Sequence, residues 1–232
     1  MRTLLNRIQV EPLSLRRVSD FVGGGRRLVS QAIAEINARG FQDIQDKHAR
    51  SDDGYKKYLD LDSHVSTVVR EASRLGLLRT TRKRVLDLGC GTGCFLYVLK
   101  AKGHDVVGID IPDHGIFNDM IQALSIPRLS HRITAFQALP DFSGNFDLIT
   151  AFSVCFDLHR TADVWGPREW NFFLEDCRSR LRPGGRVFLN FNPATTRGFS
   201  FVPDEVATLL RRIPGGRLSA SKEFFSLLVA GS

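Results

Sequence analysis

The sequence has no long hydrophobic run, and no stretch approaches the ~20 apolar residues that a membrane-spanning helix requires. Residues 1–30 lack a compact apolar segment followed by a small-residue cleavage site, so no signal peptide is predicted. Only four cysteines occur, and they fit a reduced protein better than a disulfide framework. Together these absences favour a cytoplasmic globular protein.

Metal-binding and nucleic-acid-binding patterns are also weak. The Cys90-x3-Cys94 spacing is not a usual zinc spacing and no nearby His or Cys pair completes it, so no metal is predicted. The formal net charge is +7. The basic residues of the first fifty positions occur in spread pairs without interleaved aromatics. A solvated basic face is therefore favoured over an RNA-binding platform.

The most informative stretch is RVLDLGCGTGCF, from Arg84 to Phe95. A short run of strand formers is closed by three alternating glycines, and apolar residues at helical spacing follow. This strand–glycine loop–helix unit predicts a nucleotide-type site at the carboxyl end of a strand. It lacks the dinucleotide fingerprint, whose third glycine would fall at Cys94, and it lacks the G-K-[ST] of a phosphate-binding P-loop.

The D-x-G-x-G-x-G pattern from Asp87 to Gly93 resembles motif I of the class I S-adenosylmethionine (SAM)-dependent methyltransferases. A second apolar run, HDVVGIDI, ends in an acid at Asp110, close to the ~20-residue spacing of the ribose-binding acid in such units. The segment Leu181–Val187, LRPGGRV, resembles the turn that precedes strand 5 in this family. The resemblance covers about two thirds of the chain, from Lys83 to Ala230.

The resemblance implies SAM as the cofactor, with S-adenosylhomocysteine as the product. Asp110 would take the ribose hydroxyls, and Asp87 would balance the positive charges of the ligand. The expected cofactor-binding residues are Asp87, Gly89, Cys90, Gly91, Thr92, Gly93, Asp110, Ile111, Phe136, Gln137, Phe152 and Ser153. One position departs from the family: the acid that contacts the adenine amino group would fall at Ala135, which leaves stacking by Phe136 and hydrogen bonding by Gln137 as the predicted adenine contacts.

The predicted chemistry lies after strand 4, in the segment SVCFDLH from Ser153 to His159. Methyl transfer is an in-line displacement that often requires the removal of one proton. His159 is the candidate base because its unperturbed pKa lies near neutrality, and Asp157 would orient it or act in its place. Tyr55, Tyr58, Trp165 and Asn192 are candidate substrate residues, with core packing as the competing interpretation for the aromatic ones.

The fold expected from the resemblance is a seven-stranded, mostly parallel α/β sheet with strand order 3-2-1-4-5-7-6 and an antiparallel last strand. Residues 1–80 would form an N-terminal helical cap, and residues 81–232 the SAM-binding domain. Apolar periodicity predicts helices over 26–37, 64–78, 169–181 and 203–213, and a third strand over Arg132–Phe136. Ser63 or Asp62 is the expected cap of the second helix.

The predicted function is transfer of a methyl group from SAM to an oxygen or nitrogen of a small-molecule or glycan-type acceptor. Several segments also resemble bacterial methyltransferases encoded near surface-polysaccharide genes. Two alternatives stay open: an RNA or protein methyltransferase, supported by the basic charge, and a non-catalytic SAM-binding partner subunit. No N/D-P-P-Y/F motif follows strand 4, which disfavours methylation of a base amine by that route.

Overall fold

The computed structural model describes residues 25–50, 55–153, 164–192 and 202–231. Seven strands form one sheet with the order β3-β2-β1-β4-β5-β7-β6, as expected. The strands are β1 (Arg84–Leu88), β2 (Asp105–Asp110), β3 (Arg128–Ser130), β4 (Phe146–Phe152), β5 (Leu181–Asn190), β6 (Gly216–Leu218) and β7 (Phe224–Leu228). The first five strands pair in parallel, and β7 runs antiparallel to both β5 and β6. The expected topology is therefore confirmed.

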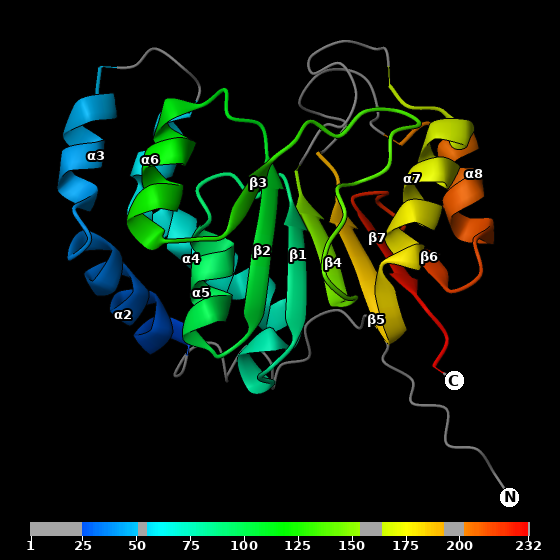
Figure 1. The fold of residues 1–232 in the computed structure, drawn as a ribbon, viewed down its shortest axis with the longest axis horizontal. Coiled ribbons are helices and arrows are strands. Elements are labelled where there is room, and N and C mark those ends of the chain that lie inside the picture. The colour runs from blue at the N-terminus through cyan, green and yellow to red at the C-terminus, as the bar shows by residue number, and fades with distance from the viewer. Residues whose placement is uncertain (1–24, 51–54, 154–163, 193–201, 232) are drawn as a thin grey trace, which may run out of the picture.

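Helices cover both faces of the sheet (Figure 1). One layer comprises α2 (Arg26–Asn37), α3 (Phe41–His48), α4 (Leu61–Arg74), α5 (Cys94–Ala101) and α6 (Gly115–Leu124), with short 3₁₀ turns at η2 (Lys56–Leu59) and η3 (Leu77–Arg79). The opposite layer comprises α7 (Pro167–Ser179) and α8 (Asp204–Arg212). Within the described part of the chain, none of these helices combines the length and the apolar character needed to cross a membrane.

The central strands are buried on both faces, as parallel strands between two helical layers must be. In β1, Val85 packs into the core shared with α2–α6, whereas Leu86 and Leu88 pack into the core shared with α7 and α8. The helices before β1 contribute to the same hydrophobic cluster as α5 and α6, through residues such as Ile36 and Val65. Their burial therefore stabilises the sheet as well as the N-terminal segment.

The helix expected over 64–78 begins and ends earlier, as α4. Its cap is Asp60, whose side chain accepts a hydrogen bond from the Ser63 N–H at 3.1 Å, so the expected cap at Asp62 or Ser63 is wrong. Gly76 adopts a φ of 78° and ends the helical run before η3. A glycine takes this left-handed conformation without the steric cost that other residues incur. The helix expected over 26–37, by contrast, is confirmed at both ends.

The third strand is displaced from its expected place at Arg132–Phe136, and that prediction is wrong. The strand that pairs with β2 is β3, with Gly108 opposite Arg128 and Asp110 opposite Ser130. Strand β2 ends at Asp110, which already pairs with Ser130, so β2 has no further residue that could pair with residues 132–136. Phe136 also has a φ of 59°, which is incompatible with an extended strand.

The segment LRPGGRV is part of β5 rather than a turn that precedes it. Phe146 pairs with Leu181 and Leu148 pairs with Arg186, so residues 182–185 form a bulge between two paired positions. Gly184, with a φ of 75°, allows this bend. The helix before it also starts earlier than expected, at Pro167, a position in the first helical turn that favours proline.

Candidate functional site

The glycine loop joins the carboxyl end of β1 to the start of α5. Gly89, Gly91 and Gly93 have φ values of 73°, 54° and 74°, a region in which side chains are strained. A Cβ atom at Gly93 would also lie 2.6 Å from Cδ1 of Ile121. Any side chain at position 93 would therefore clash with Ile121 unless Ile121 moved. The loop is therefore held in a conformation that the alternating glycines alone permit.

Asp110 lies at the end of β2 and binds the loop directly. One carboxylate oxygen accepts the Gly91 N–H at 2.6 Å, and the other accepts the Ile111 N–H at 2.8 Å. Burial raises the pKa of Asp110, and these two backbone hydrogen bonds oppose that rise. Since a carboxylate offers about four acceptor positions, about two remain for the hydroxyl groups of a ligand.

Asp87 lies beneath the loop, near the end of β1, and is only 3% exposed. Its carboxylate accepts a hydrogen bond from the Thr150 hydroxyl at 2.7 Å. Burial raises the pKa of Asp87 to about 7, the Thr150 hydrogen bond opposes this, and the charge of Asp110 adds to it. A cationic ligand bound beside such a buried acid would stabilise its ionised form.

Two tyrosines from the helical segment before β1 pack against the start of α6. The rings of Tyr55 and Tyr58 each make an edge contact with Phe117, at 5.1 and 5.2 Å between centroids. The Tyr55 hydroxyl lies 3.0 Å from Nε2 of His114, which directly precedes α6. Burial, together with the charge of Asp110, raises the pKa of Tyr58. The structure thus brings both predicted tyrosines to the cofactor edge.

The contact between His64 and the glycine loop was not predicted from the sequence. Its Nε2 lies 2.6 Å from the Thr92 hydroxyl, which joins α4 to the glycine loop. Burial, and to a lesser degree the charge of Lys57, lowers the pKa of His64 to about 4, so the ring is neutral at pH 7. A single histidine inside a helix has no local pattern that would predict this contact.

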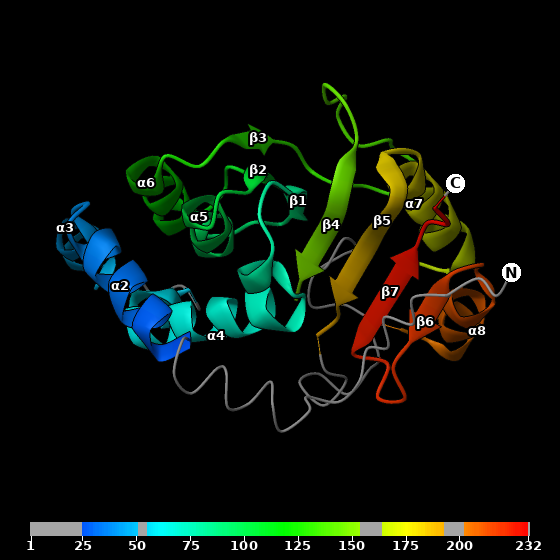
Figure 2. The ribbon, with the colours of Figure 1, turned by 90° about the horizontal axis from the view of Figure 1, so that it is seen from below.

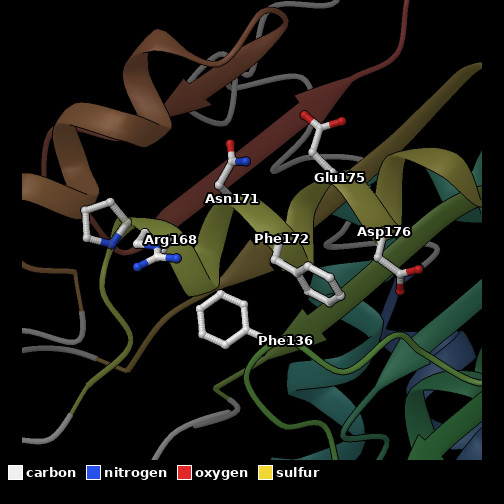
Figure 3. Close-up of a pocket in the computed structure, with 7 residues that line it drawn as sticks. Phe136, Arg168, Asn171, Phe172, Glu175 and Asp176 are labelled. Carbon is white, nitrogen blue, oxygen red and sulfur yellow. The ribbon is translucent and has the colours of Figure 1, made fainter.

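The predicted adenine residues lie on the loop between β3 and β4. The exposed ring of Phe136 makes an edge contact with Phe172 of α7, at 5.9 Å between centroids. Both rings line a hollow of about 640 Å³ beside α7, and Figure 3 shows the two rings lying close to each other. The amide oxygen of Gln137 accepts a hydrogen bond from the Thr134 hydroxyl at 2.6 Å. Phe136 is thus directed towards α7.

Strands β4 and β5 end side by side (Figure 2), and β4 also pairs with β1, which leads into the glycine loop. Phe152 packs against Phe95 of α5, at 4.8 Å between ring centroids. Ser153 follows it with a φ of 53° and is hydrogen-bonded to Asn190 and Asn192 at the end of β5. These residues form the second half of the site.

Other predicted residues lie away from this edge or outside the described residues. Asp157 and His159, the candidate catalytic pair, fall in the segment that is outside the described residues. Trp165 is buried against Trp170 and Phe173 in the core beneath α7. Across the described parts of the chain, no group of three or more His, Cys, Asp or Glu side chains could hold a metal ion.

The edge fits SAM on chemical grounds. Asp110 has free acceptor positions for ribose hydroxyls, Asp87 supplies a buried acid for a cationic group, and the glycine loop leaves room for close approach. The described residues offer no lysine at the loop to bind a phosphate chain. A family described as "Methyltransferase domain" matches residues 61–220. The chain belongs to this methyltransferase family. Its cofactor is SAM.

Relatives of this methyltransferase chain include enzymes named "Ubiquinone biosynthesis O-methyltransferase". The one from Rhizobium etli (strain CIAT 652) is 29% identical over 135 residues, covering 57% of this chain and 50% of the relative. The one from Pseudomonas aeruginosa (strain UCBPP-PA14) is 27% identical over 136 residues, covering 58% and 55%. The chain thus spans about half the length of the curated relatives that it matches.

A similar fold occurs in the crystal structure of DesVI from Streptomyces venezuelae. The two chains share 12% sequence identity with a TM-score of 0.50, over 72% of this chain and 92% of DesVI. At this identity the similarity concerns the fold of the methyltransferase chain and nothing finer.

Proposed function

We propose that this protein transfers a methyl group from SAM to an oxygen or nitrogen of a small-molecule or glycan-type acceptor. The observation that carries the proposal is the position of Asp110, which is fixed by two backbone N–H groups and keeps acceptor capacity for the cofactor ribose. The names of the ubiquinone-biosynthesis relatives support a small-molecule acceptor and favour oxygen. A cytoplasmic location is part of this proposal.

The bound cofactor supplies an electrophilic methyl group on a sulfonium centre. In our proposal Asp110 holds the ribose, Asp87 balances the positive charge, and the glycine loop excludes water from the ligand. Tyr55 and Tyr58, in the helical segment before β1, close the cofactor edge and contact the acceptor together with Asn192, whereas the buried Trp165 packs in the core. His159 removes the acceptor proton and Asp157 orients it.

Titration with SAM and S-adenosylhomocysteine, followed by a methyl-transfer assay, tests this function. The wild-type protein should bind both ligands, and Asp110→Ala should bind neither measurably at the same concentrations. His159→Ala and Asp157→Ala should retain binding and lose turnover. Binding without turnover for any sugar, phenol or amine would instead support a non-catalytic SAM-binding subunit. A salt-dependent shift with bulk RNA would support an RNA substrate.

A further inference from the structure

Strands β4 and β5 end side by side (Figure 2). Three hydrogen bonds join the residues at and just beyond these ends. The Ser153 N–H donates to the Asn190 carbonyl at 2.8 Å, and the Ser153 hydroxyl donates to Oδ1 of Asn190 at 3.0 Å. The Asn192 side-chain amide donates to the Ser153 carbonyl at 3.0 Å. All the backbone polar groups of Ser153 are therefore occupied.

Ser153 is held in an unfavourable conformation by these bonds. Its φ of 53° costs a residue with a side chain about 1–2 kcal/mol relative to the right-handed regions. Such strain persists only where the surroundings over-determine it, and it concentrates at functional sites. Ser153 is also exposed, so the strain does not serve core packing. The strained conformation places the Ser153 hydroxyl beside Asn190.

Hydrogen-bond accounting defines what this pair can offer a ligand. The Ser153 hydroxyl has one proton, and this proton is directed to Asn190. Its oxygen can therefore only accept a further hydrogen bond. The side-chain nitrogen of Asn190 carries two N–H groups, and no described residue accepts from it. The pair thus presents an acceptor oxygen, on Ser153, next to a donor nitrogen, on Asn190, at the carboxyl edge of the sheet.

We propose that Ser153 and Asn190 orient a hydroxyl acceptor and select oxygen over nitrogen as the methylated atom. This inference rests on the proposed methyltransferase function. A hydroxyl group donates its proton to the Ser153 oxygen and accepts from the Asn190 amide with one lone pair. Its second lone pair remains free to attack the methyl carbon.

A neutral amine does not satisfy the same pair. Its nitrogen has a single lone pair, which must attack the methyl carbon. If Asn190 donated a hydrogen bond to that lone pair, the nitrogen could not attack. If Asn190 did not donate, its N–H group would be left without an acceptor once the substrate had displaced water. A site built to bond a particular polar group discriminates strongly against an analogue that leaves the group unpaired.

The bonds, electrons and proton of the methyl transfer are all accounted for with these roles. The acceptor oxygen forms a bond to the methyl carbon with its free lone pair, and the carbon–sulfur bond breaks with its electron pair remaining on sulfur. As positive charge develops on the acceptor oxygen, its proton leaves the hydrogen bond to Ser153 and passes to a base, for which the proposed function assigns His159, or to water. Ser153 and Asn190 keep their protons throughout and act as orienting residues.

The test uses SAM labelled with ¹³C in the methyl group and a defined mixture of phenols, sugars and amines with matched scaffolds. The carbon chemical shift of the transferred methyl distinguishes O-methyl from N-methyl products. The wild type should give O-methyl products. Asn190→Asp, which cannot donate, should lower kcat/KM for the hydroxyl acceptor by at least about tenfold and raise the share of N-methyl product.

Two further variants keep the test decisive. Ser153→Gly removes the hydroxyl but suits a positive φ, so it should fold and show the same loss of O-methylation. Asn37→Asp introduces the same change at the exposed end of α2 and should leave product ratios unchanged. Predominantly N-methyl products from the wild type, or an unchanged ratio in Asn190→Asp, would overturn the proposal. SAM titration of each variant separates this result from a failure of the proposed function, which would abolish cofactor binding in the wild type.

Discussion

The two halves of the carboxyl edge are fixed by different means. At β1 and β2 the backbone determines the site: positive φ angles at three glycines, and main-chain N–H groups that hold Asp110. At β4 and β5 side chains determine it, through Ser153, Asn190 and Asn192. Backbone requirements leave a motif in the sequence, whereas side-chain contacts of this kind do not. A cofactor common to a family suits the first construction, and variable acceptors suit the second.

Removal of Asp110 should have the largest effect on the cofactor half. Asp110→Ala removes the proposed acceptor for the ribose hydroxyls and frees the Gly91 N–H. Two lost hydrogen bonds to a charged group amount to about 3 kcal/mol or more, so SAM affinity should fall by at least about a hundredfold in isothermal titration. Asp113→Ala, three residues away on the surface, should leave affinity unchanged. Equal affinities for the wild type and Asp110→Ala would remove the basis for this half of the comparison.

A matched pair of glycine substitutions tests whether the backbone of the loop is as constrained as its geometry indicates. Gly93 and Gly184 have nearly the same φ, 74° and 75°, but a Cβ at Gly184 meets no atom within 4 Å. Gly184→Ala should cost about 1 kcal/mol for the conformation alone. Gly93→Ala should cost about 3 kcal/mol, since the clash with Ile121 adds overpacking. Urea unfolding measures the loss of unfolding free energy in each variant. Equal losses would show that Ile121 in α6 moves aside for the new methyl group.

The sequence predicted the backbone-determined parts well and the others poorly. The order of the strands followed from the family resemblance, and helix 26–37 followed from apolar periodicity. The third strand was misplaced because residues 132–136 alternate like a strand, although the ladder ends at Asp110. His64 and Thr150 were missed because each acts through a partner that is distant in sequence.

The protonation of Asp87 should make cofactor binding depend on pH. The pKa of Asp87 in the folded protein, about 7, lies above its ordinary value of 3.8. Without ligand, its contribution to stability is fully present below about pH 4 and is lost as the pH rises through 7. A cationic ligand favours the ionised form, so SAM should bind more tightly as the pH rises towards 8.

Titration in buffers of different ionisation enthalpy should detect release of up to about one proton at about pH 6 and almost none above pH 8. Asp87→Asn should remove this proton release. Proton release that persists in Asp87→Asn would assign it to another group, with Asp110 as the next candidate because burial also raises its pKa.

The smallest expected effect concerns the contact between the proposed helical cap, which contributes Tyr55, and α6 beside the cofactor half. Tyr55→Phe removes only the hydroxyl that lies 3.0 Å from Nε2 of His114 and keeps the ring against Phe117. One neutral hydrogen bond contributes about 1 kcal/mol, so SAM affinity should fall by about fivefold at most. Tyr55→Leu removes the ring contact as well and should have the larger effect. If both variants bind SAM like the wild type, the cap stabilises the fold without closing the cofactor edge, and the backbone of the β1–β2 half is sufficient to bind the ligand.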